Sequence, residues 1–275
     1  DWGCVERIMP WGWDAHIVRL LQRLGAPAHL LPATADLERW RQLSSRRTTV
    51  LMLKHLRTSI ANDSALQFMI PADSWWCTTS EDLHRTVVGT GGAAFMKAPW
   101  SCSGRGVWRC EGTGDDKAFR RAAAILQRQG AVEVEPAYER VADLAMEYEC
   151  QADGSLRFEG LSFFDTSATG SYQGNMVAPQ EEIAARIAGY GICSVPQLQT
   201  AQEVVAYALH QVLGVSSCLL SQPTVITFNQ MQPVERDGRS MRSCRCVMQL
   251  GNEQNGVISD ENRQGIFGSG AEVRG

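Results

Sequence analysis

One segment, from Ala93 to Arg109 (AAFMKAPWSCSGRGVWR), limits more than any other what this chain can fold into. An apolar, β-prone run ends at Lys97, Pro99 stops it, and a second apolar run resumes at Val107. Between the two runs, residues 101–106 are rich in serine and glycine. The pattern predicts a strand, a flexible loop and a second strand. It differs from a P-loop, because the lysine precedes the glycines and no helix follows at once.

A loop of this composition is suited to binding polyphosphate. Small residues let backbone N–H groups approach an anion, and serine hydroxyls add further donors. A lysine fixed on the preceding strand, as Lys97 would be, brings positive charge to phosphate oxygens. On these residues alone, a β-hairpin with a turn that is merely rich in serine and glycine is an equal alternative.

The residues after this loop predict one helix and two further strands. A pair of aspartates precedes an amphipathic helical pattern that ends at Gly130. Valines and glutamates then alternate over residues 132–135, as in a strand, and Pro136 ends the pattern. A further strand is expected to begin at Asp143. The order strand, loop, strand, helix, strand predicts a mixed α/β layer, in the α/β (α+β) fold class.

Three phrases in this order, KAPWSCSGRGV, VEPAYERVADLAMEY and GLSFFDTSATGSYQGN, resemble the ATP-grasp superfamily. D-alanine–D-alanine ligase, glutathione synthetase and biotin carboxylase belong to that superfamily, and the phrases look like a little-characterised bacterial branch described only as ATP-grasp domain-containing. The resemblance covers residues 8–178 and becomes poor after residue 214. It implies two lobes of mixed sheets flanked by helices, with a partial N-terminal pre-grasp region. It also implies ATP and Mg²⁺ as ligands, and a ligase that joins a carboxylate to an amine or thiol through an acyl phosphate.

The resemblance assigns ATP-binding roles residue by residue. Lys97 would hold the α- and β-phosphates, and the loop that follows it would cover them. Glu135 and the residues after it would line the adenine site at the hinge between the lobes, and Asp143 would accept hydrogen bonds from the ribose. The implied ATP-binding residues are Arg46, Lys97, Ser101, Ser103, Gly104, Gly106, Val107, Glu135, Pro136, Tyr138 and Asp143.

Several basic residues have two interpretations. Family members commonly carry a basic residue, located before the lysine-bearing strand, that reaches the phosphates. Arg46 or Arg47 would correspond to it, with Lys54 as a further choice, and a solvated basic helix face is the alternative for all three. Arg105, inside the loop, could pair with a phosphate or an acidic substrate in a catalytic role, since arginine binds such groups bidentately. A solvent-facing Arg105 is the alternative.

Metal binding is where the sequence departs from the family pattern. Ser216 stands where an aspartate is expected, and Thr227 stands where a glutamate is expected two residues before Asn229. Neutral oxygens are poor Mg²⁺ ligands, so Asn229 and Asp165 remain the candidate metal ligands. The chain is then a degenerate, non-catalytic nucleotide-binding module, or takes carboxylates from elsewhere, such as Asp165 or Glu235. Otherwise the C-terminal part is not the natural continuation of the chain.

The pattern predicts three regions along the chain. Residues 1–90 are expected to form the partial N-terminal region, and residues 91–232 the ATP-grasp lobes, with a hinge near 133–143. Residues 233–275 are rich in Arg, Ser, Gln, Asn and Gly and poor in periodic apolar residues, so we expect an irregular or disordered tail.

Composition narrows the functional classes. A net charge of −4 and a pI near 5.8 argue against nucleic-acid binding as the main function. No apolar run approaches the roughly 18 residues of a membrane span. Nine cysteines without C-x-x-C pairs favour free thiols in a reducing cytoplasm over a zinc site.

The chain begins at Asp1 without a signal-peptide pattern, and we expect a fragment that begins inside its first domain. The expected partners are ATP and a small carboxylate substrate.

Overall fold

A computed structural model gives the fold of the 275-residue chain. The residues that the structure describes are 2–8, 10, 12–61, 63–66, 68–71, 73–101, 105–138, 142–150, 155–166, 172–191, 193–213, 224–228, 231–236, 239–246 and 248–252. The α-helices are α1 (Ala15–Arg23), α2 (Thr34–Leu43), α3 (Arg47–Ala61), α4 (Ser80–Gly89), α5 (Asp116–Gln129), α6 (Gln180–Ala188) and α7 (Val195–Leu213). Short 3-10 helices are η1 (Trp2–Cys4), η2 (Ala28–Leu30) and η3 (Ser64–Leu66). The strands are β1 (Met69–Pro71), β2 (Trp75–Cys77), β3 (Ala94–Lys97), β4 (Val107–Cys110), β5 (Val132–Pro136), β6 (Asp143–Cys150), β7 (Leu156–Thr166), β8 (Tyr172–Asn175), β9 (Thr224–Phe228), β10 (Met231–Arg236), β11 (Arg239–Cys246) and β12 (Met248–Asn252).

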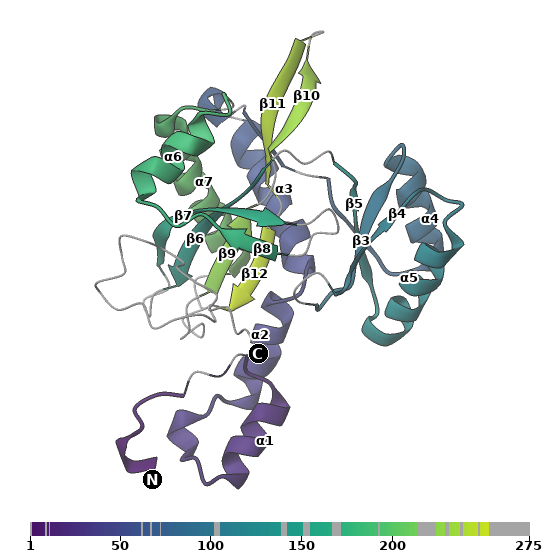
Figure 1. Cartoon of the computed structure of the whole chain (residues 1–275). Helices are drawn as coiled ribbons and strands as arrows, with labels where there is room; N and C mark the ends of the chain where they lie inside the picture. The colour runs from purple at the N-terminus through teal and green to yellow at the C-terminus, as the bar shows by residue number, and fades with distance from the viewer. Residues whose placement is uncertain are drawn as a thin grey trace.

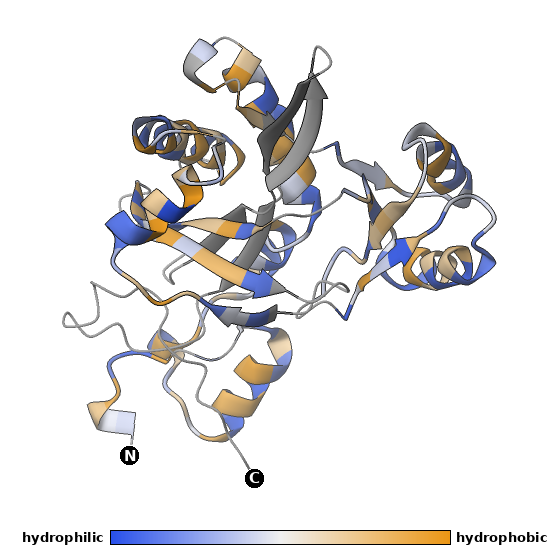
Figure 2. Cartoon of the chain, turned by 45° about the horizontal axis from the view of Figure 1, so that its top comes forward, coloured by the Kyte–Doolittle hydropathy of each residue, from blue (hydrophilic) through white to orange (hydrophobic). Residues whose placement is uncertain are grey.

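The first lobe is an antiparallel sheet in the order β2-β5-β3-β4, with α4 and α5 beside it (Figure 1). Alternate residues of β3 and β5, such as Met96 and Val134, face these helices and form one core with Leu83, Ala122 and their neighbours. The helices carry hydrophobic residues on one side and hydrophilic residues on the other (Figure 2). Period-2 strands and period-3.6 helices therefore bury one apolar face each, as the sequence predicted.

Local signals place α5 between the strands. Asp115 accepts a hydrogen bond from the Ala118 N–H at 3.0 Å and so caps the first turn. Gly130 ends the helix in a left-handed conformation with φ of 80°, which only glycine adopts at little cost. The chain then enters β5, the strand that lies between β2 and β3.

The second lobe contains the antiparallel sheet β6-β7-β8 and the antiparallel pair β9–β12. One face of β6 and β7, which includes Leu144, Met146 and Phe163, packs against α3, α6 and α7 in a second core. Figure 1 shows this lobe beside the first, with α3 between them. The fold class and the arrangement in two lobes are as expected from the sequence.

Residues before position 90 contribute to both lobes. Strand β2 pairs with β5, so it belongs to the first lobe, and α3 packs into the core of the second. Both contacts join residues that are far apart in the sequence, so local pattern could not reveal them. Helices α1 and α2, by contrast, contribute no buried residue.

The tail expected from residue 233 onward contains strands. Met231 to Arg236 pairs with Arg239 to Cys246, and the second of these strands also runs parallel to β1. The sequence of β11, RSMRSCRC, lacks an alternating apolar pattern, so local pattern does not predict this strand. Residues 253–275 lie outside the described part of the chain.

Candidate functional site

One face of the first sheet carries three charged side chains. In the β3–β5 pair Lys97 lies opposite Glu133, and Glu135, two residues further along β5, shares the same face. This is the face opposite the helix-covered core, yet the exposed fraction is only 8% for Lys97, 1% for Glu133 and 3% for Glu135. Charges buried to this extent are tolerated in a fold only when they are paired.

Lys97 and Glu135 form a buried ion pair, with Lys97 Nζ 2.7 Å from Glu135 Oε1. Burial raises the pKa of the Glu135 carboxyl, Lys97 opposes this rise, the like charge of Glu133 adds to it, and Arg46 opposes it again. The other carboxylate oxygen, Glu135 Oε2, is buried and accepts no hydrogen bond from any described residue. It is therefore an acceptor that a ligand N–H or O–H group could satisfy.

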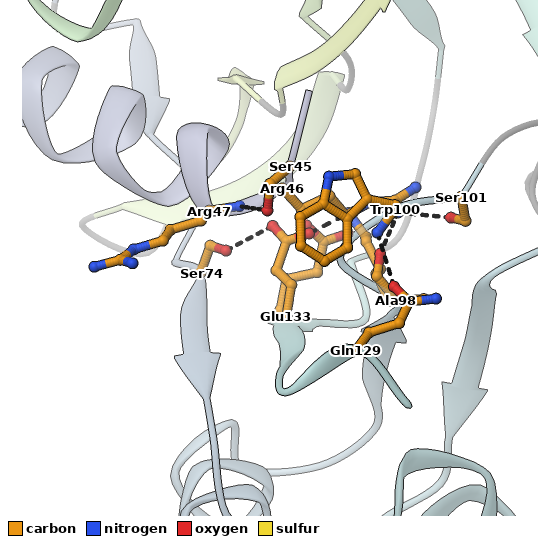
Figure 3. Close-up of polar contacts among 11 residues, drawn as sticks. Ser45, Arg46, Arg47, Ser74, Ala98, Trp100, Ser101, Gln129 and Glu133 are labelled. Carbon is orange, nitrogen blue, oxygen red and sulfur yellow. Dashed lines mark hydrogen bonds and ion pairs between the residues drawn. The ribbon is translucent and has the colours of Figure 1, made fainter. Parts of the chain in front are cut away.

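Arg46 connects the helical segment to this sheet. It lies in the turn between α2 and α3, and its backbone N–H donates to Pro99 O at 3.0 Å. Its Nη1 donates to Ala98 O at 2.5 Å and to Ser101 Oγ at 2.6 Å. On its other side, Nε lies 3.6 Å from Glu133 Oε2, and Figure 3 shows the guanidinium between these groups.

The alternative of a solvated basic helix face is therefore wrong for Arg46, whose side chain is only 14% exposed. Arg47 and Lys54, on α3, are exposed and correspond to that alternative. The turn at residues 44–46 separates α2 from α3. This turn is what directs Arg46 toward the sheet.

Trp100 fixes the start of the loop between β3 and β4. Its indole Nε1 donates to Arg41 O at 2.7 Å, and the Arg41 guanidinium lies over the indole ring at 4.6 Å. The Trp100 backbone N–H donates to Gln129 Oε1 at 3.1 Å. The loop start is thus held by α2 on one side and by the end of α5 on the other.

Gly106 closes the loop against its own beginning. The Ala98 N–H donates to Gly106 O at 2.8 Å. A Cβ added at Gly106 would lie 2.3 Å from Ser101 Cβ and 2.5 Å from Ser101 Oγ. Only glycine permits this approach, which keeps the backbone of both loop ends side by side.

The far end of the loop is held by α5. Arg121 Nη2 donates to Arg105 O at 2.7 Å, and the same guanidinium lies 4.5 Å from the centre of the Trp108 ring. Arg105 is exposed, which corresponds to its solvent-facing alternative in the absence of a ligand. Val107 begins β4 and pairs with Lys97 across the sheet.

The connection between the lobes follows β5. Pro136 ends the strand, and the Tyr138 ring packs against the core of the second lobe, where its hydroxyl accepts a hydrogen bond from the Asp73 N–H at 3.2 Å. Asp143 then begins β6 with an exposed fraction of 4%. Both Glu135 and Asp143 are thus buried at the two ends of this connection.

Of the four other predicted residues, one is described. Asp165, near the end of β7, is exposed, and Ser103, Gly104 and Asn229 lie outside the described residues. Within the described part of the chain, no three His, Cys, Asp or Glu side chains are grouped to hold a metal ion. Of the described helices, none has both the length and the apolar character needed to cross a membrane.

Glu133 and Ser74 were not predicted as site residues. Ser74 Oγ donates to Glu133 Oε1 at 2.7 Å, which places Ser74 beside the sheet just before β2. The alternation in VEVE puts Glu133 and Glu135 on one face, so the sequence did contain a signal for Glu133. It contained none for Ser74, because the β2–β5 pairing is not local.

Solved structures with a similar fold are known, whereas no family model and no curated protein sequence matches the chain. A D-cycloserine synthetase has 14% identity and a TM-score of 0.52, over 92% of this chain and 78% of that one. An N5-carboxyaminoimidazole ribonucleotide synthetase, solved with ADP, also has 14% identity and a TM-score of 0.52, over 90% of this chain and 53% of that one. Biotin carboxylase from Campylobacter jejuni, solved with β-γ-ATP, has 9% identity and a TM-score of 0.53, over 87% of this chain and 46% of that one.

These enzymes share one architecture. The chain has the ATP-grasp fold. It spans about half the length of the synthetase solved with ADP and of biotin carboxylase. In the ATP-grasp fold of this chain, Arg46, Lys97, Ser101, Gly106 and Glu135 are brought together around the loop between β3 and β4.

Proposed function

We propose that the chain binds ATP on the face of the first sheet that carries Lys97, and that it is an ATP-dependent carboxylate–amine or carboxylate–thiol ligase. One observation carries the proposal: a lysine on β3 lies buried beside a glycine-closed loop, with Glu135 and its open acceptor oxygen on the adjacent strand. The solved relatives that contain ADP or β-γ-ATP have the same fold, which supports this choice of ligand.

The charges of the site suit a polyphosphate. The cations of Lys97 and Arg46 are balanced by Glu135 and Glu133, so the cluster is stable without a ligand. An ammonium group has three N–H donors and a guanidinium five, so one such cation can serve a carboxylate and a phosphate oxygen together. Lys97 would bind the α- and β-phosphates, and Arg46 together with the backbone of the loop would bind the remaining oxygens.

The base and the ribose would lie along the connection between the lobes. Glu135 Oε2 would accept a hydrogen bond from a base amine, and Pro136 and Tyr138 would line that part of the site. Asp143 would accept hydrogen bonds from the ribose hydroxyls, because one carboxylate can take two O–H donors. Arg105, exposed at the loop, would reach the acidic substrate or the terminal phosphate.

In the proposed reaction, a substrate carboxylate oxygen attacks the γ-phosphorus, ADP leaves, and an amine or thiol then displaces phosphate from the acyl group. Positive groups are required because negative charge builds up on the transferred phosphoryl oxygens. Of the described residues, Lys97 and Arg46 can supply that charge.

A nucleotide-binding module without turnover is the second candidate. Ser216 and Thr227 favour it, because they stand where carboxylates would be required to hold Mg²⁺. This candidate binds ATP at the same site but does not carry out the ligase reaction.

Isothermal titration of ATP, with and without Mg²⁺, and an assay of phosphate release test both candidates. Binding with phosphate release in the presence of a small carboxylate and an amine supports the ligase. Binding that is independent of Mg²⁺, with no release, supports the module. A parent protein that does not bind ATP under either condition refutes the proposed site.

A further inference from the structure

A continuous line of polar contacts runs from β2 to the loop between β3 and β4. Ser74 donates to Glu133 Oε1 at 2.7 Å, and Glu133 Oε2 faces Arg46 Nε at 3.6 Å. Arg46 Nη1 then donates to Ser101 Oγ at 2.6 Å and to Ala98 O at 2.5 Å (Figure 3). Four segments distant in sequence are thus joined by one line of contacts.

Glu133 links Ser74 to Arg46 in this line of contacts. Its side chain is 1% exposed, and its two oxygens have different neighbours. Ser74 donates to Oε1, whereas Oε2 accepts no hydrogen bond from a described residue and lies 3.6 Å from Arg46 Nε. A buried carboxylate held in this way has one orientation, because turning it would remove both the hydrogen bond and the ion pair.

The geometry of arginine transmits this constraint to the loop. The guanidinium is a rigid planar fork, so a charge that fixes its Nε edge also fixes the direction of its Nη donors. In the structure, Nη1 points at the two groups that begin the loop, Ala98 O and Ser101 Oγ. Ser101 in turn lies against Gly106, so its position sets that of the loop's other end.

We propose that Glu133 is a positioning residue for the phosphate loop, acting through Arg46. It does not contact the nucleotide in this assignment. It orients the guanidinium so that Arg46 holds the loop start in place. The role in nucleotide affinity rests on the proposed function, whereas the role in loop order is a property of the chain without ligand.

The decisive variant is Glu133→Gln. It keeps the shape and an acceptor for Ser74, and it places an amide NH₂ group, a donor, against the Arg46 Nε donor. We expect ATP and ADP to bind about tenfold more weakly, as for loss of one charge-assisted contact, and adenosine to compete unchanged. In an Arg46→Met background the same Glu133→Gln change is expected to have no further effect on ATP affinity.

A matched control comes from the same lobe. Glu111 pairs with Arg109 at 2.8 Å, but both side chains are at least half exposed. Glu111→Gln therefore removes an Arg–Glu pair of the same chemistry without reaching the loop, and it is expected to leave ATP affinity unchanged. Ser74→Ala keeps all charges and removes only the donor to Glu133 Oε1, so a smaller loss of affinity in the same direction is expected.

Hydrogen–deuterium exchange without nucleotide separates this inference from the proposed function. Glu133→Gln is expected to raise amide exchange over residues 98–110, and Glu111→Gln is not. If the parent fails to bind ATP while this exchange still rises, the proposed function is refuted and the positioning role stands. Unchanged exchange in Glu133→Gln, or an equal loss of adenosine and ATP binding, overturns the inference. If Glu133→Gln does not fold, Ser74→Ala decides by the same two measurements.

Discussion

Lys97 Nζ contacts Glu135 Oε1 at 2.7 Å although the register of the sheet places Lys97 directly opposite Glu133. The lysine reaches diagonally along β5, and Glu133 is left to Arg46, which comes from the helical segment. Each acid of β5 is thus neutralised by a cation from a different part of the chain. Any change to one of these four side chains alters both the charge balance of the site and the anchoring of the loop.

Removing the Lys97 ammonium tests the phosphate role and the ion pair separately. Lys97→Met is expected to destabilise the fold by about 3–5 kcal/mol, since it leaves Glu135 buried without its partner. It should also weaken ATP binding at least about tenfold. Lys97→Met combined with Glu135→Gln should recover most of the free energy of unfolding but not the affinity. Urea unfolding and titration calorimetry measure the two effects.

If the double variant recovers ATP affinity together with stability, Lys97 has a purely structural role. If Lys97→Met alone binds ATP as tightly as the parent, the phosphate-binding role of Lys97 is excluded.

The raised pKa of Glu135 predicts a pH dependence of stability with a definite sign. Because its pKa is higher in the folded chain than in the unfolded one, the folded state binds the proton more tightly. The resulting stabilisation is complete below the unfolded value of about 4.3 and is lost as pH rises through the folded value. The Glu135→Gln variant has no titratable side chain at this position. Its free energy of unfolding, relative to the parent, should therefore increase as pH rises above about 4.3.

Urea unfolding of the parent and of Glu135→Gln at a series of pH values measures this difference. The substitution also adds an offset that does not depend on pH, so only the slope is diagnostic. A slope of the opposite sign would mean that the charge of Lys97, rather than burial, sets the direction in which the pKa of Glu135 is shifted.

Local sequence pattern predicted the helix and strands that carry the site. It could not predict the contacts between segments that are distant in the sequence. The strands around Lys97 and Glu135, the capped helix α5 and the start of β6 at Asp143 follow from alternation, capping and turn residues. The turn that directs Arg46 inward was not predicted, because no glycine or proline marks it in the sequence. Ser74 reaches Glu133 only because β2 joins β5, a pairing between segments more than fifty residues apart.

The proposed contact between Asp143 and the ribose can be tested by removing the 2′-hydroxyl group of the nucleotide. If its buried carboxylate accepts hydrogen bonds from the ribose, the parent should bind ATP more tightly than 2′-deoxy-ATP by about threefold to tenfold. Asp143→Asn should reduce that preference, and Asp143→Ala should abolish it. The measurement is the ratio of the two dissociation constants, which cancels any general effect on folding. A ratio that is unchanged in Asp143→Ala would remove Asp143 from the site.

Gly106→Ala tests whether the close approach of the loop ends matters for the ligand. The added Cβ would lie 2.3 Å from Ser101 Cβ and 3.1 Å from Ala98 Cβ, so the loop must shift, at a cost of about 1–3 kcal/mol. That shift displaces Ser101 from Arg46, and ATP affinity should fall more than affinity for adenosine. Gly114→Ala is the control, since its Cβ would meet no atom within 4 Å. Because both variants add one methyl group to the same lobe, a loss of ATP affinity confined to Gly106→Ala assigns the effect to loop closure, whereas equal behaviour of the two variants contradicts it.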